Sequence, residues 1–416
     1  MKKNGKMTFE LQYGTTGNIR LEIPEENVIS TFRAPPRCDD LKSRVREALE
    51  EPLDFPPFSR CMIPDDRMVI VLDPETPEAA TLVETVCEIA LHKGVKPEQI
   101  TVLLPAHSSS LLIEQLQKHL QEQCGAEIKV VEHDASLPNG GSYLASSSTS
   151  DRIYLDPAII EADFIFPIGQ IAFAPLLGYK GNFSTLYPGM SSEEDIKKSH
   201  GQANVELEPE DERQLHQLVE EIGWLLGIQI TLQVIASEQG GVSHVLAGAP
   251  ESVMRRGKEH LEQNWTVQIP DRLETVVVSV DTSGTGQHGW REVCAAIETG
   301  RKLVEHEGRI IVLSQLQEPA GNGINQIARS EFPTDAMRSL RETMPEDVIP
   351  ASQLARALDW ARIYLLSSLE GDYLEDLFMI PITDEADLTR LLQNELGSTG
   401  IIGSAQNVHG AVNLND

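Results

Sequence analysis

Apolar and polar residues alternate in two runs within residues 7–23, and a Thr-Thr-Gly turn separates the runs. This period of two predicts a β-hairpin at the start of the chain. From Met68 onwards, short continuous apolar runs instead alternate with segments in which apolar residues recur at helical spacing. Strands are predicted at Met68–Leu72, Ile100–Leu104 and 163–169, and helices at Pro77–His92 and Ser110–Gln123. This order favours parallel strands joined by right-handed crossovers.

A second strand–helix alternation begins at Thr275, after the polar segment 267–272. We therefore expect an α/β fold of two domains, each with a mostly parallel sheet, helices on both faces, and a cleft between the domains. The expected division is residues 1–270 for the N-terminal domain and residues 271–416 for a smaller C-terminal domain. An alternative for the last residues of the chain is that they pack against the first domain.

The charge balance narrows the classes of partner. The 416 residues include 34 Lys and Arg against 64 Asp and Glu, a formal net charge of −30. Such an acidic chain repels nucleic acids and anionic membranes, so we expect neither as a partner. The surplus is also explained simply by solubility.

The cysteines and the N-terminus bear on the compartment. The five cysteines are scattered and form no CxxC pair, which fits a reducing compartment and excludes a zinc ribbon or disulfide framework. Residues 1–14 lack the apolar core of a signal peptide, and no apolar window is long enough to span a membrane. We expect a cytoplasmic protein.

Three polar residues are candidates for one ligand site. Asp73 and His107 each follow an apolar strand, and His200 closes a Gly-rich block that starts at Gly178. The carboxyl ends of parallel strands form the usual ligand-binding edge, so we expect these three side chains around one crevice. Imidazole suits proton transfer near neutral pH. The structural alternatives are an N-cap for Asp73, a solvated His107 and a helix-end His200.

Two Gly-rich loops are further candidates for ligand contact. Gly178, Gly181 and Gly189 allow a positive φ or a close approach of the backbone to a ligand. The pattern is neither GxGxxG after a strand nor a Walker loop, so no dinucleotide or ATP site is predicted. A second loop, residues 281–290, either faces the same crevice from the other domain or is only a turn.

The order of these features resembles the nickel-pincer lactate racemase family over nearly the whole chain. The matching features are a strand followed by Asp73 and Pro77 in D-x-x-x-P, a strand ending in His107, and a Gly-rich loop closing on Pro188 and Gly189, with His200 eleven residues later. The paired strands within residues 230–248 and the strands at 275–281 and 308–314 also resemble the family.

The resemblance implies an isomerase that racemises or epimerises a small 2-hydroxy acid by reversible hydride transfer, with a nickel-pincer nucleotide as its cofactor. In the family, a loop lysine carries the pincer, one histidine ligates nickel and two others act as bases. By position, His200 is the metal ligand, His107 one base and Asp73 the supporting acid. The implied cofactor-binding residues are Lys180, Gly178, Gly181 and Ser184.

The chain departs from the family pattern at several of these positions. Ser184 stands where the family has its pincer lysine, and Lys180 is the remaining lysine of the loop. Ala174 stands at the second base and Thr76 at an expected arginine. The lysine expected on the first helix of the second domain is absent, and Arg291 lies nearby.

Three functions therefore remain open. The first is a hydroxy-acid isomerase that acts as the family does. The second is a divergent member without a covalent pincer, which binds a small polar ligand or catalyses other chemistry. The third is a regulatory or interaction protein on the same scaffold.

Overall fold

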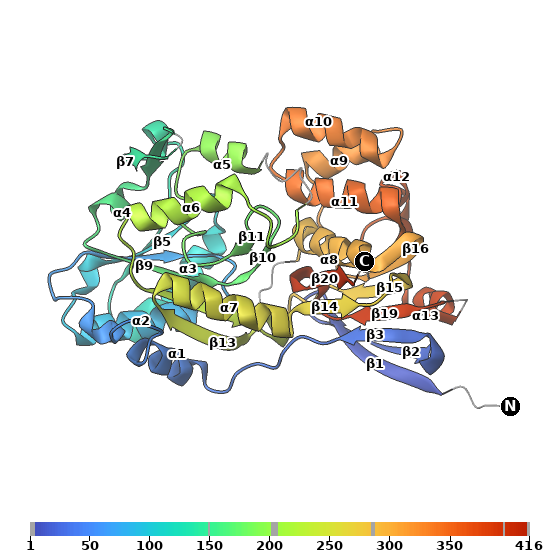
Figure 1. Cartoon of the computed structure of the whole chain (residues 1–416), viewed down its shortest axis with the longest axis horizontal. Coiled ribbons are helices and arrows are strands. Elements are labelled where there is room, and N and C mark those ends of the chain that lie inside the picture. The colour runs from blue at the N-terminus through green and yellow to red at the C-terminus, as the bar shows by residue number, and fades with distance from the viewer. Residues whose placement is uncertain (1–4, 149, 201–206, 284–287, 394–395, 414–416) are drawn as a thin grey trace.

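The computed structural model describes residues 5–148, 150–200, 207–283, 288–393 and 396–413. Its described part contains two six-stranded sheets that lie side by side, each covered by helices (Figure 1). The expected two-unit α/β fold with parallel-rich sheets is confirmed.

The first sheet is built from the apolar runs of the N-terminal half. In spatial order it contains β13 (Val242–Gly248), β12 (Thr231–Ala236), β9 (Phe164–Gln170), β4 (Met68–Leu72), β5 (Ile100–Leu104) and β6 (Lys129–Glu132). All neighbours are parallel except β13, which is antiparallel to β12. The central position of β4 explains why all five of its residues are buried.

Helices cover both faces of this sheet. Ile70 and Leu72 pack towards one face, against α1 (Leu41–Glu50), α2 (Ala79–His92) and α3 (Ser110–Cys124). Val69 and Val71 pack towards the other, against α4 (Pro157–Glu161) and α6 (Gln214–Leu225). Alternate residues of one strand therefore belong to two separate cores.

The second sheet is wholly parallel. Its spatial order is β18 (Ile380–Ile382), β17 (Arg362–Leu366), β16 (Val304–Leu313), β15 (Leu273–Ser279), β19 (Thr399–Ile402) and β3 (Val28–Phe32). One face packs against α8 (Trp290–Leu303) and α11 (Val348–Trp360). The other packs against the hairpin β1 (Lys6–Tyr13)–β2 (Gly17–Pro24) and α13 (Glu385–Gln393).

The N-terminal segment lies with the second sheet, which differs from the expected division at residue 270. β3 pairs with β19, and the apolar face of the hairpin, including Phe9 and Leu21, covers Val277 and Ile311. The hairpin buries its apolar face there because a two-stranded hairpin has no core of its own. We propose that the units divide near residue 270, with residues 5–32 assigned to the C-terminal unit.

Several elements were not expected. Residues 267–272, read as a polar boundary, overlap strand β14 (Thr266–Ile269), which pairs with β20 (His409–Val412). Strand β7 (Ser142–Ser146), which pairs with β8 (Arg152–Leu155), was also not predicted. The remaining elements are β10 (Ala172–Ala174), β11 (Gly178–Lys180), α5 (Glu193–His200), α7 (Pro250–Asn264), α9 (Asn322–Ala328), α10 (Ala336–Thr343) and α12 (Gly371–Asp376). Within the described ranges, every helix is too short or too polar to cross a membrane.

Candidate functional site

Asp73 and Lys180 form an ion pair at the carboxyl edge of the first sheet. The Asp73 backbone N–H donates to the Ile168 carbonyl at 2.9 Å, which continues the pairing of β4 with β9. The β10–β11 hairpin brings Lys180 to this edge, where its Nζ donates to Asp73 Oδ2 at 3.2 Å. The two side chains are only 12% and 15% exposed. Asp73 Oδ1 accepts from the Glu75 N–H at 2.9 Å, so this carboxylate does not cap α2.

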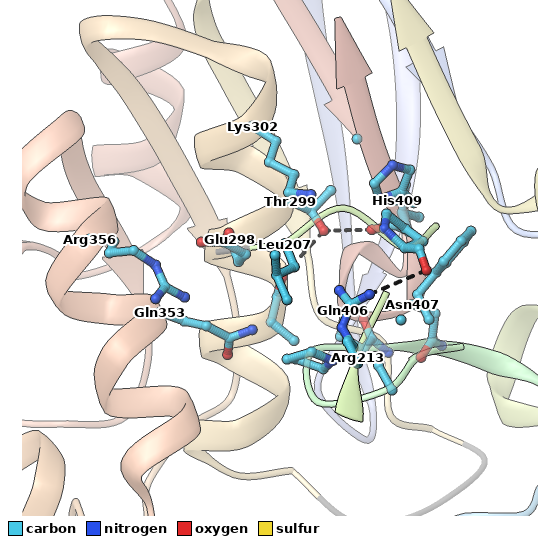
Figure 2. A pocket seen from close by; sticks show the side chains of 18 residues that line it. Leu207, Arg213, Glu298, Thr299, Lys302, Gln353, Arg356, Gln406, Asn407 and His409 are labelled. Carbon is cyan, nitrogen blue, oxygen red and sulfur yellow. Dashed lines mark hydrogen bonds between the residues drawn. The ribbon is translucent and has the colours of Figure 1, made fainter. Parts of the chain in front are cut away.

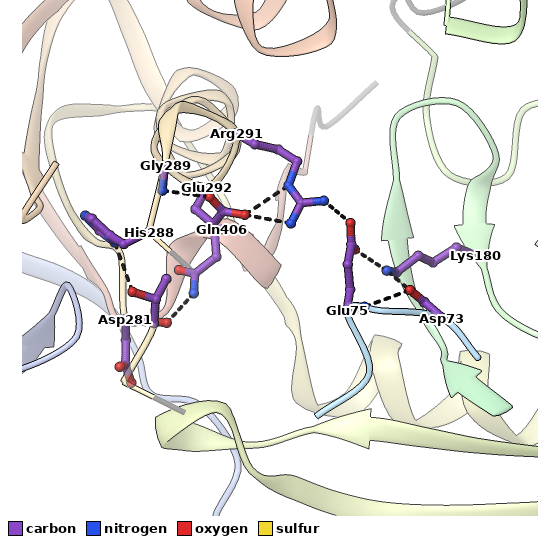
Figure 3. A network of polar contacts seen from close by, with 10 residues as sticks. Asp73, Glu75, Lys180, Asp281, His288, Gly289, Arg291, Glu292 and Gln406 are labelled. Carbon is purple, nitrogen blue, oxygen red and sulfur yellow. Dashed lines mark hydrogen bonds and ion pairs between the residues drawn. The ribbon is translucent and has the colours of Figure 1, made fainter. Parts of the chain in front are cut away.

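The ion pair continues into the second unit through Glu75. Lys180 Nζ also donates to Glu75, and Glu75 in turn accepts from Arg291 on α8 (Figure 3). Arg291 donates to Glu292 at 2.7 Å, and Glu292 Oε2 accepts from the Gly289 N–H at 3.0 Å. A chain of charges thus joins the two units. Neither Glu75 nor its pairing with Arg291 was predicted from the sequence.

His107 and His200 lie around α5. His107 has a positive φ of 65°, and its Nε2 lies 3.0 Å from Glu193 Oε1, with both side chains more than half exposed. His200 is the last residue of α5. Burial lowers the pKa of His200, and the charge of the nearby His107 lowers it further. Both effects favour the neutral form of the His200 imidazole.

The predicted residues form two groups. Asp73 and Lys180 make up one, and His107 and His200 the other. Among the described residues no hydrogen bond or ion pair joins the two groups. The strands that precede Asp73 and His107, β4 and β5, are neighbours in the first sheet. Their convergence on one ligand stays a prediction.

Hydrogen bonds within the protein hold the Gly-rich loop that leads to α5. Ser184 Oγ accepts from the Gly181 N–H at 3.0 Å. The buried Asn182 donates to the Pro250 carbonyl at 2.7 Å and accepts from Thr231 Oγ1 at 3.0 Å. The path of the loop is therefore fixed by α7 and β12.

Two glycines of this loop have a structural reason to be glycine. Gly178 has a φ of +74°, and a Cβ there would lie 2.1 Å from the Pro209 carbonyl oxygen. Gly181 has a φ of +141°, and a Cβ there would lie 2.8 Å from Ile171 Cγ1. Both close approaches are to protein atoms. A role in cofactor binding for these glycines stays a prediction.

The second Gly-rich loop is described only in part, since residues 284–287 lie outside the described ranges. Asp281 Oδ1 accepts from the Ser283 N–H at 3.1 Å, and its Oδ2 accepts from the Gln239 N–H at 3.2 Å. His288 Nε2 accepts from the Gln315 N–H at 3.0 Å, and burial lowers the pKa of His288. The described ends of the loop are held by internal contacts.

The donor set does not fit a covalent nickel pincer. Residue 184 carries a hydroxyl, and the Lys180 ammonium is occupied by Asp73 and Glu75. Position 174, expected for a second base, is an alanine in β10. Across the part of the chain that the structure describes, no three His, Cys, Asp or Glu side chains gather as a metal site.

Comparison with known proteins agrees with this fold. Residues 13–211 match the family model of the lactate racemase N-terminal domain. The chain is similar to the lactate racemase apoprotein from Thermoanaerobacterium thermosaccharolyticum, with 16% identity, a TM-score of 0.81, and coverage of 97% of this chain and 100% of that chain. It is also similar to a crystal structure of a protein from Thermotoga maritima, with 14% identity, a TM-score of 0.66, and coverage of 91% and 100%.

No curated protein matches the sequence significantly. At these identities the similarity to solved structures establishes the fold alone, and the family match rests on the N-terminal half. Residues 13–211 therefore belong to the lactate racemase N-terminal domain family, and the chain as a whole shares the fold of the lactate racemase apoprotein.

Proposed function

We propose that this protein binds a small 2-hydroxy acid or a related polar ligand at the carboxyl edge of its first sheet, without a covalent pincer. The proposal rests on the two ion pairs that Lys180 forms. Its Nζ contacts Asp73 and Glu75, and Glu75 also pairs with Arg291. Amide formation would require both ion pairs to break, because a lysine reacts through its free amine.

Asp73 and His107 are the proposed catalytic groups. A carboxylate at a strand end can accept a hydrogen bond from a substrate hydroxyl, and an exposed imidazole can exchange a proton with solvent or substrate. His200, whose pKa is lowered by burial and by His107, is suited to accept a proton at neutral pH. In this proposal His200 acts as a base and not as a nickel ligand, since a single histidine is a weak metal site.

The alternative is racemisation or epimerisation of a hydroxy acid by the family's hydride-transfer chemistry. It requires Lys180 to leave Asp73 and Glu75 and to reach the position at which Ser184 now accepts from Gly181. Contacts of Asn182 with Pro250 and Thr231 oppose such a change in loop path. The geometry therefore favours the non-pincer proposal.

We also propose that the binding partner is a small molecule and not a nucleic acid or a membrane. The net charge of −30 supports this. We further propose the cytoplasm as the compartment, because all five cysteines are free thiols.

Calorimetric titration of the metal-free protein with D-lactate, L-lactate and glycerate tests the proposal. We expect saturable binding of at least one of these acids, weakened about tenfold by His107→Ala, which corresponds to one lost charge-assisted hydrogen bond. His92→Ala is the matched control, because His92 ends α2 at the opposite edge of the sheet. Absence of binding by all three acids, or equal effects of the two substitutions, would contradict the proposal.

A further inference from the structure

A cavity of about 370 Å³ lies at the carboxyl edge of the second sheet. Its walls are the turn of the β1–β2 hairpin, the segment that follows β16, and the segment that follows β17. The carboxyl ends of parallel strands form the usual ligand-binding edge of an open α/β sheet. The polar lining includes Thr15, Thr16, Gln315, Gln317, Glu318 and Ser368.

This cavity is separate from the candidate site on the first sheet. Its described lining includes neither the ion pair of Asp73 and Lys180 nor His107 or His200. It also shares no described lining residue with the smaller cavity between the two units, which lies along α8 (Figure 2). A ligand at the carboxyl edge of the second sheet would therefore occupy a site of its own.

The side chain of Gln315 ties the hairpin turn to the second sheet. Its Oε1 accepts from the Thr15 N–H at 3.0 Å and from the Thr16 N–H at 3.2 Å. The backbone N–H of Gln315 donates to His288 Nε2 at 3.0 Å, so the proton of this imidazole lies on Nδ1. Burial also lowers the pKa of His288. Both effects favour a neutral ring, which adds no positive charge to the cavity.

The main chain holds the other two walls. The Leu316 carbonyl accepts from the Ser368 N–H at 2.8 Å, which joins the segments after β16 and β17. The Glu318 carbonyl accepts from Trp290 Nε1 at 3.1 Å, which joins the same segment to α8. The backbone around the cavity is thus fixed by the protein, and a preorganised site costs a ligand less ordering free energy.

Three side chains of this lining are available to a ligand. Gln317, Glu318 and Ser368 are exposed, and their side chains form no hydrogen bond or ion pair with any described residue. They offer a carboxylate that accepts, a carboxamide that donates and accepts, and a hydroxyl that does both. The described lining contains no lysine or arginine.

These groups discriminate between classes of ligand. An anion would meet the Glu318 carboxylate without a cation to offset the repulsion. A small ammonium ion would pair with Glu318, but it has no acceptor for the N–H groups of the Gln317 carboxamide. A polyhydroxy compound has several hydroxyl groups that each donate and accept, so it can satisfy all three side chains at once.

We propose that this cavity binds an uncharged polyhydroxy compound of the size of a monosaccharide. The two carboxylate oxygens of Glu318 accept from neighbouring hydroxyl groups, and Gln317 and Ser368 bond to further hydroxyl groups of the same ligand. The site goes beyond the proposed function on the first sheet and does not depend on it.

Titration of the full chain with D-glucose, D-ribose and myo-inositol, followed by saturation-transfer NMR of the ligand, tests the proposal. We expect saturable binding of at least one of the three. Glu318→Gln should weaken it about tenfold, through loss of charge-assisted hydrogen bonds. Gln317→Leu, which keeps the volume but removes the carboxamide, should weaken it about fivefold.

Two further variants serve as controls. Glu305→Gln makes the same change as Glu318→Gln at an exposed residue near the amino end of β16, and it should leave binding unchanged. His107→Ala, at the candidate site of the first sheet, should also leave this binding unchanged. Because the Glu318 side chain has no partner among the described residues, Glu318→Gln should keep the melting temperature, so weaker binding reports a lost ligand contact.

Ethanolamine and L-lactate as competitors distinguish the classes of ligand. We expect neither to displace the bound polyhydroxy compound. Displacement by ethanolamine would identify a cation site, and displacement by L-lactate an anion site, and either would overturn the proposal. Failure of all three polyhydroxy compounds to bind, unchanged binding in Glu318→Gln, or equal weakening by Glu305→Gln would overturn it as well.

Discussion

At the scale of single residues, Lys180 holds two carboxylates together at the edge of the first sheet. Replacing it by alanine leaves Asp73, which is 12% exposed, without its cation. We expect Lys180→Ala to lower the free energy of unfolding by roughly 3 kcal/mol, the cost of breaking a largely buried pair. Urea denaturation measures this. Lys118→Ala, which removes an exposed pair with Glu122, should change stability by less than about 0.5 kcal/mol.

His133 gives a second prediction, because it tethers the segment before α5. Its Nδ1 lies 2.8 Å from Asp156 Oδ2 and its Nε2 lies 2.9 Å from the Ser191 carbonyl oxygen. Both partners are acceptors, so both nitrogens carry protons. Burial alone would lower the pKa of His133, but the bonds to Asp156 and Ser191 outweigh it and raise the pKa.

The stabilisation from His133 is therefore complete below the unfolded pKa of about 6.5 and is lost as the pH rises through the raised folded value. His133→Gln should destabilise the protein most near pH 6, and the difference from the unsubstituted protein should shrink as the pH rises to 9. Denaturation at several pH values measures this, and a difference independent of pH would contradict the account.

At the scale of elements, the β10–β11 hairpin depends on a glycine at its second strand. Alanine at Gly178 combines a φ of +74° with a Cβ 2.1 Å from the Pro209 oxygen and 2.8 Å from Arg213 Nη1. Gly227 is the matched control, because its φ is +66° but a Cβ there meets nothing within 4 Å. We expect Gly227→Ala to cost about 1 kcal/mol and Gly178→Ala at least about 2 kcal/mol more. Equal costs would show that the hairpin can move away from residues 209–213.

The strands that could be predicted from the sequence are those with a strong local pattern of apolar residues. The run Met68–Leu72 is apolar throughout and was predicted with the correct bounds. β14 was missed because its four residues become a strand only by pairing with residues 409–412, far along the chain. The helices α9 to α12 were also missed.

For the site, too, the sequence predicts what a local pattern marks and does not predict contacts between distant parts of the chain. The strand ends located Asp73 and His107, because sequence marks where an apolar run stops. The partners of Lys180 could not be predicted, since the ion pair between Glu75 and Arg291 joins positions 216 residues apart.

At the scale of the whole molecule, the two units are joined by more than one covalent connection. In the N-terminal segment the hairpin covers one face of the second sheet and β3 forms its edge strand, and the chain then crosses to the first sheet before returning at β15. Glu75 and Arg291 bridge the units, and the His409 ring centroid lies 5.0 Å from that of Phe173 in β10. The proposed site at Asp73 adjoins this interface through Lys180 and Glu75, so its geometry depends on the units keeping their relative positions.

The central claim is that this lactate racemase-like protein carries no covalent pincer. Intact-mass measurement after coexpression with pincer-making enzymes tests it most directly, with a lactate racemase produced in the same cells as the positive control. We predict that the control gains the mass of the cofactor and that this chain keeps the mass of its unmodified sequence. A mass increase that matches the cofactor and disappears in Lys180→Ala would contradict the claim and restore the racemase function.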